Sequence, residues 1–147
     1  MFNGDKIKIN KLMTSGFISY VILEMSRLLF ALWTGQFHAM PGEFTWEKFY
    51  SLSVTLSFGV GLLGVLIGYF FGKFQHRIPF NNIYVKSIAY HLVILILISF
   101  YKGISYLTSL DFAFSVALII FVGWFFIRFY KLIAKGTGDP IINDTEP

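Results

Sequence analysis

The sequence has no cysteine and little charge. The absence of cysteine among its 147 residues excludes disulfide bridges, CxxC redox pairs and thiolate metal sites. Charged residues make up only 14% of the chain, whereas ordinary soluble proteins contain about 25%. Hydrophobic residues make up 56%, more than a soluble domain of this length can hide from water. The composition therefore excludes a soluble globular domain and predicts that the protein lies in a lipid bilayer.

Sequence motifs for catalysis and cofactor binding are also missing. The chain has no HExxH, P-loop, dinucleotide fingerprint, GxSxG or EF-hand pattern. Of its three histidines only His91 falls within an apolar run, so one chain cannot supply two axial ligands to a haem. We therefore predict no enzymatic activity, no metal and no cofactor. The net charge of +4 does not indicate a nucleic-acid partner, because the basic residues lie between apolar runs.

Four apolar runs dominate the chain, at about 12–34, 49–72, 83–101 and 109–130. A helix needs about 20 mostly apolar residues to cross a bilayer, so each run predicts one transmembrane helix. Thr45 and Asn82 are suitable helix caps before the second and third runs. Thr108, Ser109 and Asp111 all offer oxygen acceptors at the start of the last run. The short connections favour an all-α, up-down antiparallel four-helix bundle. We expect one transmembrane domain over 1–138, followed by a short polar tail at 139–147.

The basic residues are distributed unevenly among the connections. Two lie in the first and third connections, Lys48 and Lys102, whereas nine lie in the other flanks: Lys6, Lys8, Lys11, Lys73, Arg77, Lys86, Arg128, Lys131 and Lys135. The positive-inside rule then predicts that both termini are cytoplasmic. This clean charge bias is typical of a multi-pass protein of a prokaryotic plasma (inner) membrane.

Small residues form a stripe along the second run, at Ser53, Ser57, Gly61, Gly64, Gly68 and Gly72. Their spacing of three or four residues places them on one face of a helix. Membrane helices associate by close packing, and glycines let a second backbone approach. The stripe, a glycine zipper in pattern, predicts a helix-packing face from Ser57 to Gly72. This face packs against a helix of the same chain, or it packs against a second copy in a homo-oligomer. In the third alternative, the glycines line a pathway.

Ionisable residues interrupt two of the runs. Glu24 and Arg27 lie three residues apart on one face of the first helix, together with Tyr20. At 1.5 Å per residue, His91 in the third helix lies within about 6 Å of Glu24 in depth. We expect Glu24, Arg27, His91 and Tyr20, with Tyr90 beside them, to meet inside the bundle. The cluster is either an ion pair and a histidine that fix helix register, or a site on an ion pathway.

Two functions remain open on the sequence alone. The first is a small non-catalytic membrane protein, an accessory or self-associating helical subunit whose partners are the bilayer and other copies or other membrane subunits. The second is a small homo-oligomeric transporter or channel, linked to protons or cations, with the polar cluster at its midplane. The packing face and the lack of reaction motifs favour the first, and the polar cluster favours the second.

Overall fold

The structure, a computed structural model, describes residues 9–35 and 44–138. These residues form five α-helices and one short 3-10 helix and contain no strand: α1 (Ile9–Trp33), α2 (Trp46–Phe74), η1 (Gln75–Arg77), α3 (Ile83–Lys102), α4 (Ile104–Leu107) and α5 (Leu110–Gly136). Four of the helices, α1, α2, α3 and α5, are long and apolar enough to cross a membrane. The all-α, multi-pass prediction is therefore confirmed at this level. The predicted tail at 139–147 lies outside the described residues.

Side-chain caps fix where three of the long helices begin. The Thr45 hydroxyl accepts a hydrogen bond from the Lys48 amide, and the Asn82 side chain accepts from the amides of residues 84 and 85. The Ser109 hydroxyl accepts from the Phe112 amide. The caps predicted at Thr45 and Asn82 are confirmed, and of the three candidates before the last helix Ser109 is the cap. α5 extends six residues beyond the predicted 130, because no glycine or proline interrupts the chain before Gly136.

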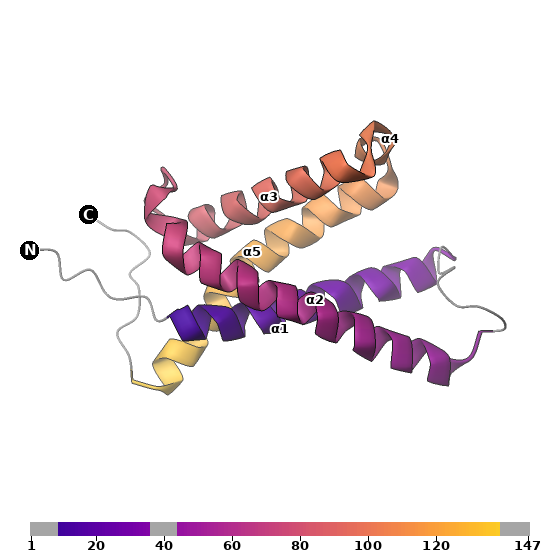
Figure 1. Cartoon of the computed structure of the whole chain (residues 1–147), viewed down its shortest axis with the longest axis horizontal. Helices are drawn as coiled ribbons and strands as arrows, with labels where there is room; N and C mark the ends of the chain where they lie inside the picture. The colour runs from indigo at the N-terminus through magenta and orange to yellow at the C-terminus, as the bar shows by residue number, and fades with distance from the viewer. Residues whose placement is uncertain (1–8, 36–43, 139–147) are drawn as a thin grey trace, which may run out of the picture.

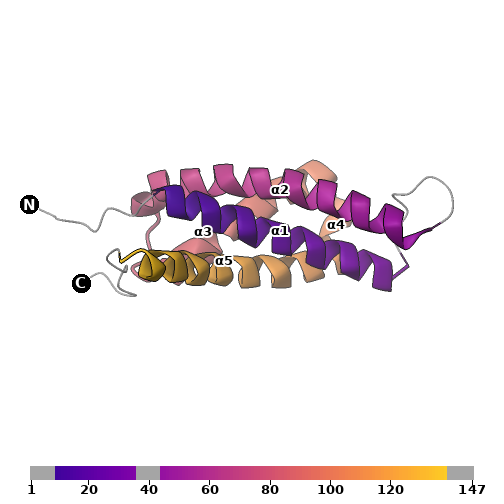
Figure 2. The same cartoon turned by 90° about the horizontal axis from the view of Figure 1, so that it is seen from below.

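α2 packs against α1 (Figures 1 and 2). The small residues of α2 face α1. A methyl group added to Gly64 would lie 2.3 Å from the carbonyl oxygen of Gly16, and one added to Gly68 would lie 2.3 Å from that of Leu12. Residue numbers rise along α1 as they fall along α2, so the two helices are antiparallel. The backbones touch here, and only glycine permits that approach.

A second close contact joins α3 and α5, which run side by side in Figure 1. A methyl group on Gly123 would lie 2.8 Å from the Cα of Ile88, and the Ser87 hydroxyl donates to the Gly123 carbonyl at 2.7 Å. We call α1 with α2 the first hairpin, and α3 with α5 the second hairpin.

Hydrogen bonds from Ser15 and Tyr90 join the helices of one hairpin to those of the other. The Ser15 hydroxyl of α1 donates to the Phe126 carbonyl of α5, and the Tyr90 hydroxyl of α3 donates to the Ile67 carbonyl of α2 at 3.3 Å. Around these bonds lies an apolar core drawn from all four long helices: Leu12, Phe71, Ile83, Phe126, Ile127 and Tyr130. α5 is apolar nearly all round, and the structure buries one of its faces against α1 and α3. Large apolar side chains elsewhere on the helix stay exposed: Leu110, Ile120, Phe121, Trp124 and Leu132.

Gly123→Ala is expected to loosen the second hairpin. The new methyl group would meet the Ile88 backbone, which cannot rotate away, and overpacking of this kind costs about 1–3 kcal/mol. The free energy of unfolding in detergent micelles measures the loss. Gly136→Ala is the matched control, because no atom lies within 4 Å of a methyl group at that helical position. Equal stability of the two variants would contradict the close contact.

Candidate functional site within the spanning helices

The structure divides the predicted polar cluster into two pairs. Glu24 and Arg27 form an ion pair on α1, and the rings of Tyr20 and His91 lie against each other between α1 and α3. In the described part of the chain, no hydrogen bond or ion pair joins Glu24 or Arg27 to His91. The expectation that all four side chains meet is therefore not met.

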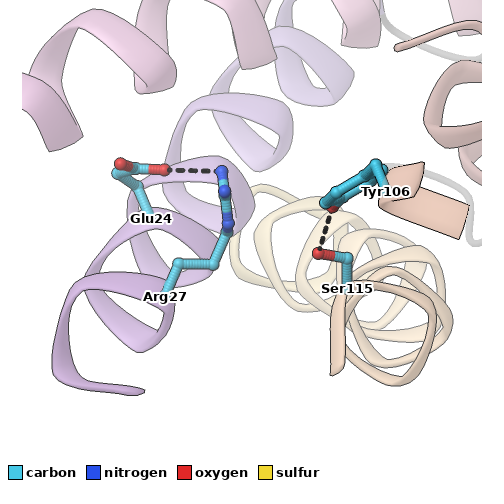
Figure 3. A network of polar contacts seen from close by, with 4 residues as sticks. All are labelled: Glu24, Arg27, Tyr106 and Ser115. Atoms are coloured by element: carbon cyan, nitrogen blue, oxygen red, sulfur yellow. Dashed lines mark hydrogen bonds and ion pairs between the residues drawn. The ribbon is translucent and has the colours of Figure 1, made fainter. Parts of the chain in front are cut away.

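The Glu24–Arg27 pair lies along one face of α1. The Arg27 guanidinium is 3.5 Å from a Glu24 carboxylate oxygen, and the residues are three apart, as helical neighbours must be. Figure 3 shows the pair beside Tyr106 of α4 and Ser115 of α5, whose hydroxyl groups hydrogen-bond at 3.0 Å. The Glu24 side chain is 13% exposed and that of Arg27 is 44% exposed. The Glu24 side chain is therefore the more buried of the two.

A cleft of about 180 Å³ opens beside this pair, between α1 and the start of α5. Its polar wall holds Glu24 and Arg27 from α1, and Asp111 and Ser115 from α5. The stacked rings of Phe30 and Phe114, 3.8 Å apart, form part of its apolar wall. We call this space the polar cleft; it offers two carboxylates and one guanidinium to a polar or charged group. The sequence marks Asp111 only as an acceptor at the start of the last run, and its place in a cleft was not predicted.

The Tyr20–His91 pair is buried in the interior. The two ring centroids are 5.8 Å apart, and His91 is completely inaccessible. His91 Nδ1 lies 2.7 Å from the carbonyl oxygen of Ser87. Neither His91 Nε2 nor the Tyr20 hydroxyl has a hydrogen-bond partner. Tyr90 lies nearby, as expected, and its ring centroid is 5.5 Å from that of His91. Its hydroxyl, however, donates a hydrogen bond to the Ile67 carbonyl of α2.

The predicted helix-packing face lies against the first helix. Gly61 faces the side chains of Phe17 and Val21, and Gly72 faces that of Leu12. Ser57 is buried on the same face of α2. Because α1 covers these residues, a second copy cannot use this face while the first hairpin remains closed.

Several buried serines were not singled out from the sequence. Ser15 and Ser87 each bond a backbone carbonyl of α5. Their spacing could have identified them. Ser15 and Ser19 are four residues apart on α1, and the same spacing runs along α3 through Ser87, His91, Leu95 and Ser99. Small polar residues at this spacing are typical of contacts between membrane helices.

The polar side chains of the cleft and of the Tyr20–His91 pair can form hydrogen bonds and ion pairs. Within residues 9–35 and 44–138, no three His, Asp or Glu side chains are close enough to share a metal ion. Glu24 and Asp111 line one cleft, but Asp111 is exposed and no hydrogen bond connects the two carboxylates. The polar cleft is thus suited to binding a polar or charged group. Comparison with known proteins finds no matching family model, no matching curated protein and no matching solved structure.

Proposed function

We propose that the protein is a non-catalytic helical subunit of a membrane assembly, in which it acts as an accessory or self-associating component. The observation that carries the proposal is the filled interior. Leu12, Phe71, Phe126 and Ile127 are completely buried at the end where α1 begins and α5 ends. A single chain whose interior is closed by large apolar side chains offers no continuous polar route, so it fits the role of a packed subunit better than that of a pore.

The proposal includes an up-down arrangement with both termini in the cytoplasm. Lys11 near the start of α1 contacts Thr137 just after α5, which supports placing the two termini on one side. Lys131 lies over the Tyr84 ring at 4.9 Å, so the start of α3 is at this end too. The excess of basic residues at this end supports the cytoplasmic side.

We place the partner-binding surface on the side of α2 that α1 does not cover. Large apolar side chains repeat every four residues on the uncovered side of this helix, at Val54, Phe58, Leu62 and Leu66. An exposed apolar stripe within a spanning helix contacts either lipid or another helix. We propose that a second copy or another membrane subunit covers part of this stripe.

Native electrophoresis with mass identification tests the assembly. Extracted gently from its source membrane, the protein should migrate as a discrete complex, either with other polypeptides at fixed ratio or as an oligomer of itself. A monomer alone, over a range of mild detergents, would contradict the proposal.

Single cysteines on α2 then locate the contact, since the chain has no cysteine of its own. Phe58→Cys places a thiol on the exposed stripe, and Ser57→Cys places one on the neighbouring buried position as a matched control. For self-association through the stripe, oxidation should give disulfide dimers from the first variant and not from the second. Equal dimer yield from both would contradict this surface.

The polar cleft favours a second candidate function, a transporter or channel linked to protons or cations. Ionisable side chains within a membrane often mark ion or substrate pathways, and the cleft brings Glu24, Arg27 and Asp111 together. Ala31→Cys on the cleft wall should react with a membrane-impermeant thiol reagent if water reaches the cleft. Leu62→Cys on the exposed apolar stripe is the control. Protection of Ala31→Cys, or unchanged ion flux in reconstituted Glu24→Gln protein, would argue against transport.

A further inference from the structure

Five buried side-chain atoms in the described residues have no hydrogen-bond partner: the hydroxyl oxygens of Ser19, Tyr20, Ser53 and Ser57, and His91 Nε2. The serine hydroxyls can satisfy themselves by rotating toward the carbonyl four residues earlier. Ser99 bonds Leu95 in this way at 2.7 Å, and Thr55 bonds Ser51 at 2.9 Å. The Tyr20 hydroxyl and His91 Nε2 have no such local solution, because the rings hold these two atoms away from their own helices. They are the pair that requires an explanation.

The hydrogen bond at His91 Nδ1 fixes the role of the other ring nitrogen. A carbonyl oxygen only accepts, so Nδ1 must carry the proton that it donates to Ser87 at 2.7 Å. In the neutral ring, Nε2 is then an unprotonated acceptor. It is buried with no donor, and the hydroxyl of the neighbouring Tyr20 ring has neither donor nor acceptor. An acceptor and a hydroxyl are thus both unsatisfied on two rings that lie against each other, one from each hairpin.

We propose that Tyr20 and His91 form a binding site for one water molecule, which donates to His91 Nε2 and accepts from the Tyr20 hydroxyl. The ring centroids are 5.8 Å apart and neither polar atom has a partner in the described residues, so one small bridging molecule would satisfy both. Buried waters occupy sites of this kind, between polar groups that would otherwise be orphaned.

The surroundings select a neutral ligand. The rings that contact His91 are those of Tyr20 on α1, Tyr90 on α3 and Phe126 on α5, and none is a carboxylate. Leu23, Leu95, Ile119 and Val122 pack around Tyr20. With no counter-charge in contact, a cation would be bound in apolar surroundings without compensation. Water supplies the missing donor and acceptor at no such cost.

The site adds a polar connection between the hairpins. Ser15 connects α1 to α5, Tyr90 connects α3 to α2, and the bridged pair connects α1 to α3. Hydrogen bonds between membrane helices contribute modestly to stability, but they fix which turns face each other. The water would therefore set the register of the two hairpins, whatever partner the protein has in the membrane.

Magnetic resonance of ¹⁵N-histidine-labelled protein in lipid bilayers tests the site. His91 should show a protonated Nδ1 and an unprotonated Nε2, with a cross-peak from Nε2 to a water proton. The His91→Gln variant assigns the signals among the three histidines. Tyr20→Phe should abolish the water cross-peak. Tyr90→Phe is the matched control and should preserve it, because that ring also touches His91 but its hydroxyl bonds Ile67.

Three results would overturn the proposal. A protonated Nε2 would show that the acceptor does not exist. A cross-peak to the Tyr20 hydroxyl proton with none to water would show a direct bond. A water cross-peak that survives Tyr20→Phe would show that the water is held elsewhere.

Discussion

Gly64→Leu is expected to prevent the first hairpin from closing. A single added carbon at Gly64 would already lie 2.3 Å from the Gly16 carbonyl oxygen and 2.8 Å from the Tyr20 Cβ, and a leucine adds three more. Backbone atoms cannot turn aside, so α1 and α2 must separate along their whole contact. The cost should exceed the ~3 kcal/mol at the upper end of ordinary overpacking. Low yield and aggregated migration in size-exclusion chromatography would report the loss of the folded chain.

Gly59→Leu separates this effect from the general consequences of adding a leucine to α2. Gly59 lies on the same helix, five residues earlier, and a methyl group there meets no atom within 4 Å. The variant should therefore fold with normal yield, since leucine also forms helix better than glycine. Normal yield and migration of Gly64→Leu, alongside the Gly59→Leu control, would contradict the packing of α1 on the glycine face.

The long helices were predictable because their signal is local. Each run of about 20 apolar residues can be recognised without its neighbours, and the caps at Thr45, Asn82 and Ser109 are set by a few adjacent residues. The glycine face was recognisable for the same reason, as a stripe at helical spacing. The sequence alone left open which helix would cover it, because the stripe is equally suited to an intrachain and an intermolecular contact.

The depth of the polar cluster could be predicted only to within about one helical turn. Tyr20 and Glu24 are one turn apart, about 6 Å along α1. Tyr20 meets His91, whereas Glu24, one turn further on, lines the cleft with Asp111 of α5. An estimate of depth that is good to one turn cannot decide between these neighbours. Close backbone contacts, such as that between Gly123 and Ile88, fix how each helix sits against its neighbours. Such a contact is hard to predict from the sequence, because it depends on an isolated glycine in an apolar helix.

Arg27→Leu is expected to be the most destabilising single change in the polar cleft. It leaves the Glu24 carboxylate, only 13% exposed, without its partner at 3.5 Å inside a spanning helix. An unpaired acid near the centre of a membrane helix costs about 2.5–3.5 kcal/mol on insertion scales. Glu24→Leu should cost less, because the Arg27 side chain is 44% exposed and its long stem lets the guanidinium move toward water. The free energies of unfolding in detergent micelles should rank the two variants in that order.

The double variant Glu24→Leu/Arg27→Leu decides whether the pair is needed for folding. Replacing both members of a buried ion pair by apolar residues is often neutral or stabilising, whereas removing one member strands the other. The double variant should therefore recover most of the stability that Arg27→Leu loses, although the polar cleft would then lack two of its charged residues. Additive losses in the double variant would show that each charge has its own partner in the assembled protein. Recovery of stability without recovery of complex formation or ion flux would instead assign the pair to function, because folding would no longer explain its presence in the membrane.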